Sequence, residues 1–245
     1  MTENIKQALE YAVVLARREQ KIVKDENGVE YYDADRHNLV MLEPKEYYPD
    51  TLKLSTLSSL VKYYKDNLNN INQQKTIIVV ETPTLVSVYT EDDSRKKRTK
   101  LLSVTADVVS FNYGMFHSQE EFIISMQSKF VNSGDREIVI DYASKLAVQD
   151  GADLEDDGIS QVTTVKSGVA SKSKAVAPNP VRLKPYRTFN EVEQPDSNFV
   201  FRINKHAQMA LFEADGGAWT SEAKRNVAEY LTKELQLYKD AIVLA

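Results

Sequence analysis

Residues 210–219 gather the residue types that could perform chemistry. They read ALFEADGGAW and hold Glu213 and Asp215, two consecutive glycines and the only tryptophan of the chain. Because residues two apart in a β-strand lie on the same face, the two carboxylates could bind a metal ion or act as acid and base. No third ligand can be identified in the sequence, so this interpretation depends on the carboxylate pair alone.

The same segment also fits a corner between a strand and a helix. The glycine pair gives the backbone freedom at a turn, and Thr220 or Ser221 can cap the helix that follows. Glu222 lies where the positive end of a helix favours a carboxylate, and Trp219 would anchor the helix to the sheet. We favour the corner, because turn chemistry accounts for every residue of the segment.

Other signs of catalysis are weak. His37, His117 and His206 stand apart without metal-ligand spacing, and there is no phosphate loop, nucleophile elbow, zincin or deaminase pattern. The lack of cysteine excludes disulfides, thiolate catalysis and thiolate-bound zinc, and suits a reducing compartment. We therefore predict no catalytic residue, no metal site and no cofactor, which favours a non-enzymatic protein but leaves a carboxylate enzyme open.

Two basic segments could contact nucleic acid. The first, SRKKRTK at 94–100, lies at the tip of a predicted hairpin, where its cations could reach phosphates. Lysine-rich tips also discourage aggregation at a sheet edge, which is the alternative reason for this composition. The predicted phosphate contacts of this segment are Arg95, Lys96, Lys97, Arg98 and Lys100.

The second basic segment runs from Val165 to Phe189 without an acidic residue. Its two aromatic residues, Tyr186 and Phe189, offer rings that could stack on bases. Alternatively, the acidic run from Asp150 to Asp157 neutralises the segment within the protein. The predicted nucleic-acid contacts are Lys172, Lys174, Arg182, Lys184, Tyr186 and Arg187.

Composition limits the classes of function. The 245 residues carry a net charge of only −5, so any surface for nucleic acid must be local. No apolar stretch is long enough to span a membrane, and the first twenty residues lack the pattern of a secretion signal. We expect a soluble intracellular protein without a membrane partner.

Apolar periodicity predicts an N-terminal extension at residues 1–50. Apolar residues recur at helical spacing over 3–21, and Asn27-Gly28 between short apolar runs predicts a β-hairpin. Residues 38–44 could add a third strand.

The rest of the chain, 51–245, predicts an α+β core domain. Ser118 and Glu121 have the spacing of a capping box, and an exposed excursion is expected at about 150–180, where apolar periodicity fades. Residues 135–149 fit a strand or a helix, and we favour the helix. Further predictions are helices at 57–71, 118–131 and 219–238, strands within 76–109 and 181–214, and a short strand at 241–245.

The fold predicted from these elements is a central antiparallel sheet covered by helices. Strands of 76–104 and 181–214 form the sheet, and the helices at 118–131 and 219–238 cover it. Two independent cores divided near residue 150 would contradict this arrangement.

Several segments, in order, resemble the YfdQ-like proteins of phages and prophages, a family of unknown function. They are EEFIISMQSKFV, DDGISQ, PNPVRLKPYRTFNEVEQPDSNFVFR and ALFEADGGAW, and the resemblance spans roughly residues 51 to 245. It implies a phage early protein of the host bacterial cytoplasm, from genes near replication and recombination functions. It supplies no established catalytic residues.

Two functions follow as hypotheses. The first is a non-enzymatic accessory in phage DNA metabolism that binds single-stranded nucleic acid through the two basic segments. The second is an inhibitor of a host enzyme or antiphage defence complex that acts through protein–protein contacts. We also expect a homo-oligomer, because uncovered strand edges and thirteen tyrosines provide self-complementary surfaces.

Overall fold

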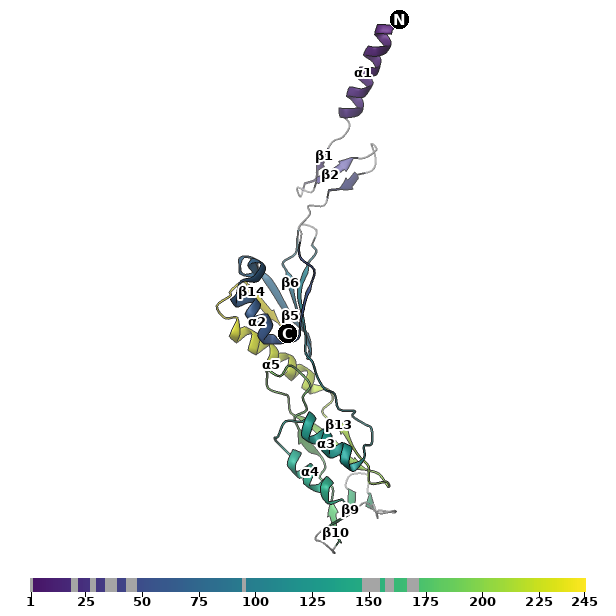
Figure 1. The fold of residues 1–245 in the computed structure, drawn as a ribbon, viewed down its shortest axis with the longest axis vertical. Helices are drawn as coiled ribbons and strands as arrows, with labels where there is room; N and C mark the ends of the chain where they lie inside the picture. Colours follow the sequence, from purple (N-terminus) through teal and green to yellow (C-terminus); the bar gives the residue numbers. More distant parts are fainter. Residues whose placement is uncertain are drawn as a thin grey trace. The chain divides into compact units, whose positions relative to one another are not determined.

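Figure 1 shows the helices and strands of the protein in a computed structural model. It describes residues 2–18, 22–26, 30–33, 39–42, 48–93, 96–146, 155–156, 161–166 and 172–245. The chain divides into two compact units. The first unit consists of Met1–Pro49 and Asp92–Lys97, and the second consists of Asp50–Glu91 and Arg98–Ala245.

The first unit begins with helix α1 (Thr2–Arg18). Three short antiparallel strands follow in the order β1-β2-β3, with bounds Ile22–Lys24, Glu30–Asp33 and Leu39–Met41. The predicted helix and the strands of the predicted hairpin are therefore present. The Asn27-Gly28 turn itself lies outside the described residues.

This unit has no core of its own among its described side chains. None of those within residues 1–49 is buried, and the two hydrophobic clusters found among the described residues consist of residues from the second unit. The apolar side chains Ile5, Leu9 and Tyr11 of α1 are 61%, 61% and 67% exposed. Among the described residues of its own unit, no side chain covers this apolar surface of the helix.

The larger sheet of the second unit has five strands in the order β14-β5-β6-β7-β4. The central strands β5 (Thr76–Thr82), β6 (Leu85–Thr90) and β7 (Lys100–Thr105) are antiparallel. The two edge strands, β14 (Ala241–Leu244) and β4 (Leu52–Leu54), each run parallel to their neighbours. The sheet is therefore mixed, and the predicted purely antiparallel sheet is correct only for its centre.

Two helices pack against this sheet, α2 (Leu57–Lys65) and α5 (Ala218–Glu234), and a short 3-10 helix, η1 (Leu68–Gln73), follows α2. Thr56 caps α2 by accepting a hydrogen bond from the Ser59 backbone. Buried and half-buried residues alternate along β5. Ile78 and Val80 are buried in the hydrophobic cluster that also contains residues of α2 and α5. The opposite face of β5 is only half-buried.

The remaining core strands form a separate antiparallel sheet in the order β11-β12-β13. Helices α3 (Gln119–Lys129) and α4 (Arg136–Lys145) pack on it, and Phe122, Met126 and Phe201 are fully buried there. The strands are Val181–Leu183, Ser197–Ile203 and Met209–Glu213. The prediction that residues 76–104 and 181–214 build one sheet is therefore wrong.

Parts of the segment at 150–180 form regular structure that its composition does not indicate. Its described residues form a third sheet, β10-β9-β8, with bounds Lys172–Val176, Gln161–Lys166 and Glu155–Asp156. The Gln161 amide oxygen accepts a hydrogen bond from Ile203 N at 2.8 Å, and its nitrogen donates to Ile203 O at 3.1 Å. This buried amide ties β9 to the end of β12, so the excursion is not wholly exposed.

The two hydrophobic clusters alternate along the chain. The cluster around the five-stranded sheet draws on 57–104, 189 and 227–235, and the other draws on 111–146 and 177–211. The smaller lobe is therefore inserted between β7 and α5 of the larger one. Both belong to the same compact unit, and no boundary near residue 150 separates them.

The capping box of α3 provides a stability prediction. Ser118 Oγ accepts a hydrogen bond from Glu121 N at 3.3 Å, and the Glu121 carboxylate accepts one from Ser118 N at 3.1 Å. Ser118→Ala is expected to lower the free energy of unfolding by about 1 kcal/mol, measured by urea denaturation. Ser128→Ala, at an exposed position later in the same helix, is the control, and an equal loss in both variants would contradict the capping role.

Candidate functional site

The ALFEADGGAW segment forms the predicted corner between a strand and a helix. It ends β13 and begins α5, and Gly216 and Gly217 adopt φ values of +61° and +80°. These left-handed values favour glycine. Gly217 N donates a hydrogen bond to Asp215 Oδ1 at 3.0 Å. Gly217 is the N-cap, so the predicted cap at Thr220 or Ser221 is wrong, because both residues lie within α5.

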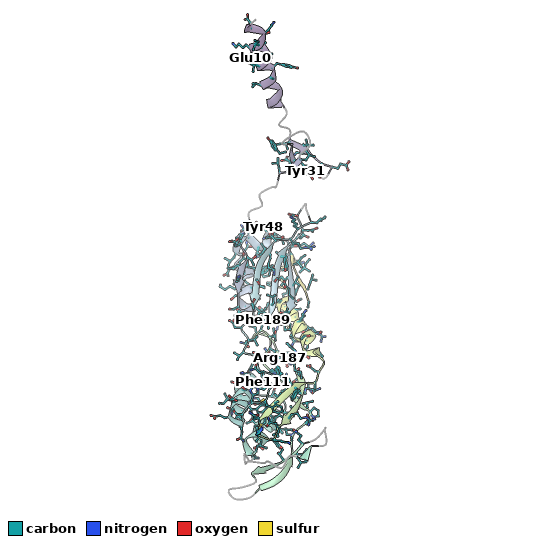
Figure 2. All side chains as sticks on the ribbon, turned by 90° about the vertical axis from the view of Figure 1, so that its right-hand side faces the viewer. Glu10, Tyr31, Tyr48, Phe111, Arg187 and Phe189 are labelled. Carbon is teal, nitrogen blue, oxygen red and sulfur yellow. The ribbon has the colours of Figure 1, made fainter. Side chains whose placement is uncertain are left out.

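The side chain of Arg187 lies at the centre of the contacts made by this corner. Arg187 is only 7% exposed, and Figure 2 shows it between the labelled Phe189 and Phe111. Its Nη1 donates to Glu213 Oε1 at 2.7 Å, and its guanidinium carbon lies 4.0 Å from the centre of the Trp219 ring. Trp219 therefore covers a buried cation.

Ser197, at the start of β12, links this cation to the second carboxylate. Its Oγ accepts a hydrogen bond from Arg187 Nη2 and donates one to Asp215 Oδ2 at 2.6 Å. Both carboxylates of the corner thus compensate one buried guanidinium, which fits the rule that buried charges are paired. Glu213 and Asp215 act as its structural partners in this arrangement.

Phe199 and Tyr113 also belong to this cluster: the Arg187 guanidinium carbon lies 5.7 Å from the centre of the Phe199 ring, and the charge of Arg187 acts on the Tyr113 hydroxyl. The Tyr113 ring stacks on Phe199 with centres 5.3 Å apart, and its hydroxyl is buried without a hydrogen-bond partner in the described part of the chain. Burial raises the pKa of Tyr113, although Arg187 acts in the opposite direction. Tyr113 therefore stays a neutral phenol near neutral pH.

The ionised form of Asp215 should make stability depend on pH. Burial raises its pKa, but hydrogen bonds from Ser197 and Gly217 and the charge of Arg187 outweigh burial and hold the pKa below its usual value. A carboxyl with a lower pKa in the folded state stabilises the protein above its unfolded pKa of about 4. That contribution is lost as pH falls through the folded pKa.

Asp215→Asn should therefore flatten the fall in the free energy of unfolding as the pH is lowered below about 4. Urea denaturation across this range measures the effect. Glu222→Gln, at an exposed position of α5, is the control. An unchanged slope for Asp215→Asn would contradict the inferred contribution of the carboxylate.

The hairpin tip between β6 and β7 holds the first basic segment. Arg95 lies outside the described residues. Lys96 forms an ion pair with Asp92 Oδ2 at 3.2 Å, whereas Lys97 and Arg98 are exposed. Lys100 lies back in strand β7, where its ammonium group contacts Glu81 Oε1 at 3.3 Å and the face of the Tyr89 ring.

The second basic segment is dispersed in the structure. Lys172 and Lys174 lie in β10, and their side chains lie outside the described part of the molecule. Arg182 pairs with Asp196 at 2.7 Å, and Lys184 pairs with Glu193 at 2.6 Å. These carboxylates follow the segment in sequence, whereas the predicted neutralising run at Asp150–Asp157 lies mostly outside the described residues.

The aromatic residues of this segment differ in exposure. Tyr186 is 39% exposed, and it lines a hollow of about 400 Å³ together with Lys129 and Asn190. Phe189 is 1% exposed in the core beneath the five-stranded sheet, so the prediction that it offers a stacking surface is wrong. The burial of Arg187 likewise leaves its guanidinium without the exposure that a phosphate contact needs.

Comparisons with protein-family models, curated proteins and solved structures give no match. Within the described ranges, no group of three histidine, aspartate or glutamate side chains is arranged to hold a metal ion. None of the helices in those ranges combines the length and apolar character needed to cross a membrane. The relation to the YfdQ-like family therefore stays a prediction from the sequence.

Proposed function

We propose that this chain is a non-enzymatic phage accessory protein that acts by binding another protein through helix α1. The observation that carries the proposal is the exposure of every described side chain in α1, where no described residue of the same unit covers Ile5, Leu9 and Tyr11. Isolated helices of about this length are marginal in water, and most of their stability in proteins comes from packing of an apolar face. A partner would supply that packing.

The spacing of the apolar residues indicates the kind of partner. Ile5, Leu9 and Ala12 stand at positions i, i+4 and i+7, so they lie along one side of α1. A helix with such anchors binds by laying its apolar face into a hydrophobic groove. The proposed partner is therefore a protein with an apolar groove, and the resemblance to phage proteins supports a host enzyme or defence complex as its source.

The ion pairs of the basic segments give less support to the nucleic-acid hypothesis. Lys96, Lys100, Arg182 and Lys184 each contact a carboxylate, and a phosphate would have to displace it. Lys97 and Arg98 are exposed and keep that hypothesis testable. Binding of single-stranded nucleic acid is therefore the competing outcome in the experiment.

The experiment is a pull-down of the full chain from infected bacteria, with and without nuclease. Ile5→Glu/Leu9→Glu should lose the captured protein, because it places charges on the apolar face. Asn4→Glu/Gln7→Glu, which changes exposed polar positions of the same helix, should retain it. Hydrogen exchange of α1 should slow when the purified partner is added to the unchanged protein, and fail to slow for the first variant.

Three results would overturn the proposal. One is equal capture by both variants. Another is light scattering that shows a homo-oligomer lost only in Ile5→Glu/Leu9→Glu. That result would show that the apolar face of α1 binds a second copy of this chain. The third is nuclease-sensitive capture with direct binding to single strands that weakens when residues 95–98 become alanine. Each lost phosphate contact should then reduce the slope of log affinity against log salt by about 0.7.

A further inference from the structure

Strand β14 leaves one backbone edge of the five-stranded sheet open. It is the terminal strand of that sheet and pairs only with β5 among the described strands. Thr76 N donates to Asp240 O at 2.8 Å, so the backbone groups of Asp240 and of every second residue after it are directed towards β5. Since alternate residues of an edge strand direct their backbone groups to the neighbour, the N–H and C=O of Val243 point away from the sheet.

Nothing in the sequence of β14 blocks this edge. Natural edge strands are commonly protected by charged side chains, proline or bulges. Ala241–Leu244 reads AIVL and contains no charge and no proline, and its register with β5 shows no shift. A further strand can therefore add to β14 without a clash of charge or loss of a donor.

The two faces beside this edge differ in chemistry. Ala241 and Val243 pack against the core beneath α5. Ile242 and Leu244 point to the opposite face, where they are 37% and 50% exposed and lie next to half-buried residues of β5. That open face therefore presents apolar side chains along the edge.

On the face that carries α5, a groove of about 810 Å³ runs along the helix beside the end of β14. Its charged lining residues are Lys224, Arg225, Lys233 and Glu229, so positive charge predominates. None of the three cations forms an ion pair with a carboxylate in the described part of the chain. The groove is therefore suited to acidic side chains.

We propose that the edge of β14 binds an extended segment of a partner protein as a sixth strand, and that this segment alternates acidic and apolar residues. Side chains of a strand alternate between the two faces of a sheet. The acidic residues of the added strand would lie beside α5, and its apolar residues would lie beside Ile242 and Leu244. Strand addition supplies affinity through the backbone and specificity through alternate side chains. This surface is independent of α1.

The test uses a fluorescent, end-blocked heptapeptide of alternating valine and glutamate, Val-Glu-Val-Glu-Val-Glu-Val, with the full chain. Fluorescence anisotropy should show saturable binding that weakens as salt increases. A peptide of the same composition in blocks, Val-Val-Val-Val-Glu-Glu-Glu, is the control probe and should bind at least roughly tenfold more weakly, since it cannot match both faces.

Two pairs of variants separate the charge contribution from the backbone contribution. Arg225→Glu/Lys233→Glu should weaken binding of the alternating peptide by roughly tenfold. Lys53→Glu/Lys205→Glu, with the same charge change at exposed positions outside the groove, should bind as the parent does. Val243→Pro removes the outward N–H and should also weaken binding roughly tenfold, whereas Val243→Ala, which keeps the N–H, should not.

The proposal is overturned if the alternating and block peptides bind equally, or if neither binds at low salt. Equal loss in Arg225→Glu/Lys233→Glu and its control would also overturn it, because affinity would then reflect net charge alone. Circular dichroism checks that Val243→Pro stays folded. If that variant unfolds, the charge-reversal pair and the two peptides still decide the outcome.

Discussion

Replacement of Arg187 by alanine is expected to lower the free energy of unfolding by about 3 kcal/mol. The change removes a 7% exposed cation and leaves Glu213 and Asp215 without the charge that compensates them. It also removes the packing of the guanidinium under Trp219. Urea denaturation at neutral pH, followed by circular dichroism, measures the loss.

Two further variants identify its cause. Arg182→Ala breaks an exposed ion pair with Asp196 and should cost less than about 1 kcal/mol. Arg187→Met keeps much of the volume beneath Trp219 but removes the charge, so it should be destabilising because the two carboxylates still lose their partner. An Arg187→Ala variant as stable as Arg182→Ala would contradict the structural role of the buried cation.

Phe201→Ala is expected to lower the free energy of unfolding by about 3–5 kcal/mol. Phe201 is fully buried in β12, with ring centres 5.5 Å from Phe122 and 6.1 Å from Tyr142. Its truncation would leave a cavity in the smaller lobe. Denaturant unfolding measures the total loss, and hydrogen exchange locates it.

The exchange pattern should separate the two lobes. Protection should fall most in β12, α3 and α4, which share the cluster with Phe201, and least in β5 and β6 of the other cluster. Phe212→Ala, at an exposed position in β13, is the control and should cost less than about 1 kcal/mol. Equal loss of protection in both sheets would show that the lobes unfold together.

Local patterns in the sequence predict most of the individual elements. The capping box of Ser118 and Glu121 fixes the start of α3, and helical spacing predicts α2, α4 and α5. The β-branched residues of 76–82 and 85–90 predict β5 and β6. These signals depend on residues close together in the chain, where side-chain spacing alone selects a helix or a strand.

The assembly of these elements is less predictable, because strand pairing depends on contacts between distant residues. The three-residue strand β4 is too short for a recognisable period, and its parallel pairing with β7 has no local signal. The hairpin of β9 and β10 is missed because small and polar residues dominate it. Part of its packing comes from the amide of Gln161, which composition does not reveal.

The candidate site shows the same division. The glycine pair predicts the corner, since it provides a positive φ whatever surrounds it. The partner of the corner, Arg187, comes from a segment that the sequence suggests is an exposed basic surface. Its burial follows from the sheet register that places Ser197 and Glu213 near it. A list of charges along the chain cannot distinguish a buried cation from a solvated one.

The insertion of the smaller lobe between β7 and α5 has a consequence for synthesis on the ribosome. All residues of the inserted lobe emerge before α5 and β14, so its core can close while the larger sheet still lacks one edge strand and one covering helix. One edge of strand β5 is then unpaired until Ala241–Leu244 form hydrogen bonds with it. During that interval the nascent chain exposes an apolar strand that chaperones recognise, so its yield in cells should depend on chaperone supply.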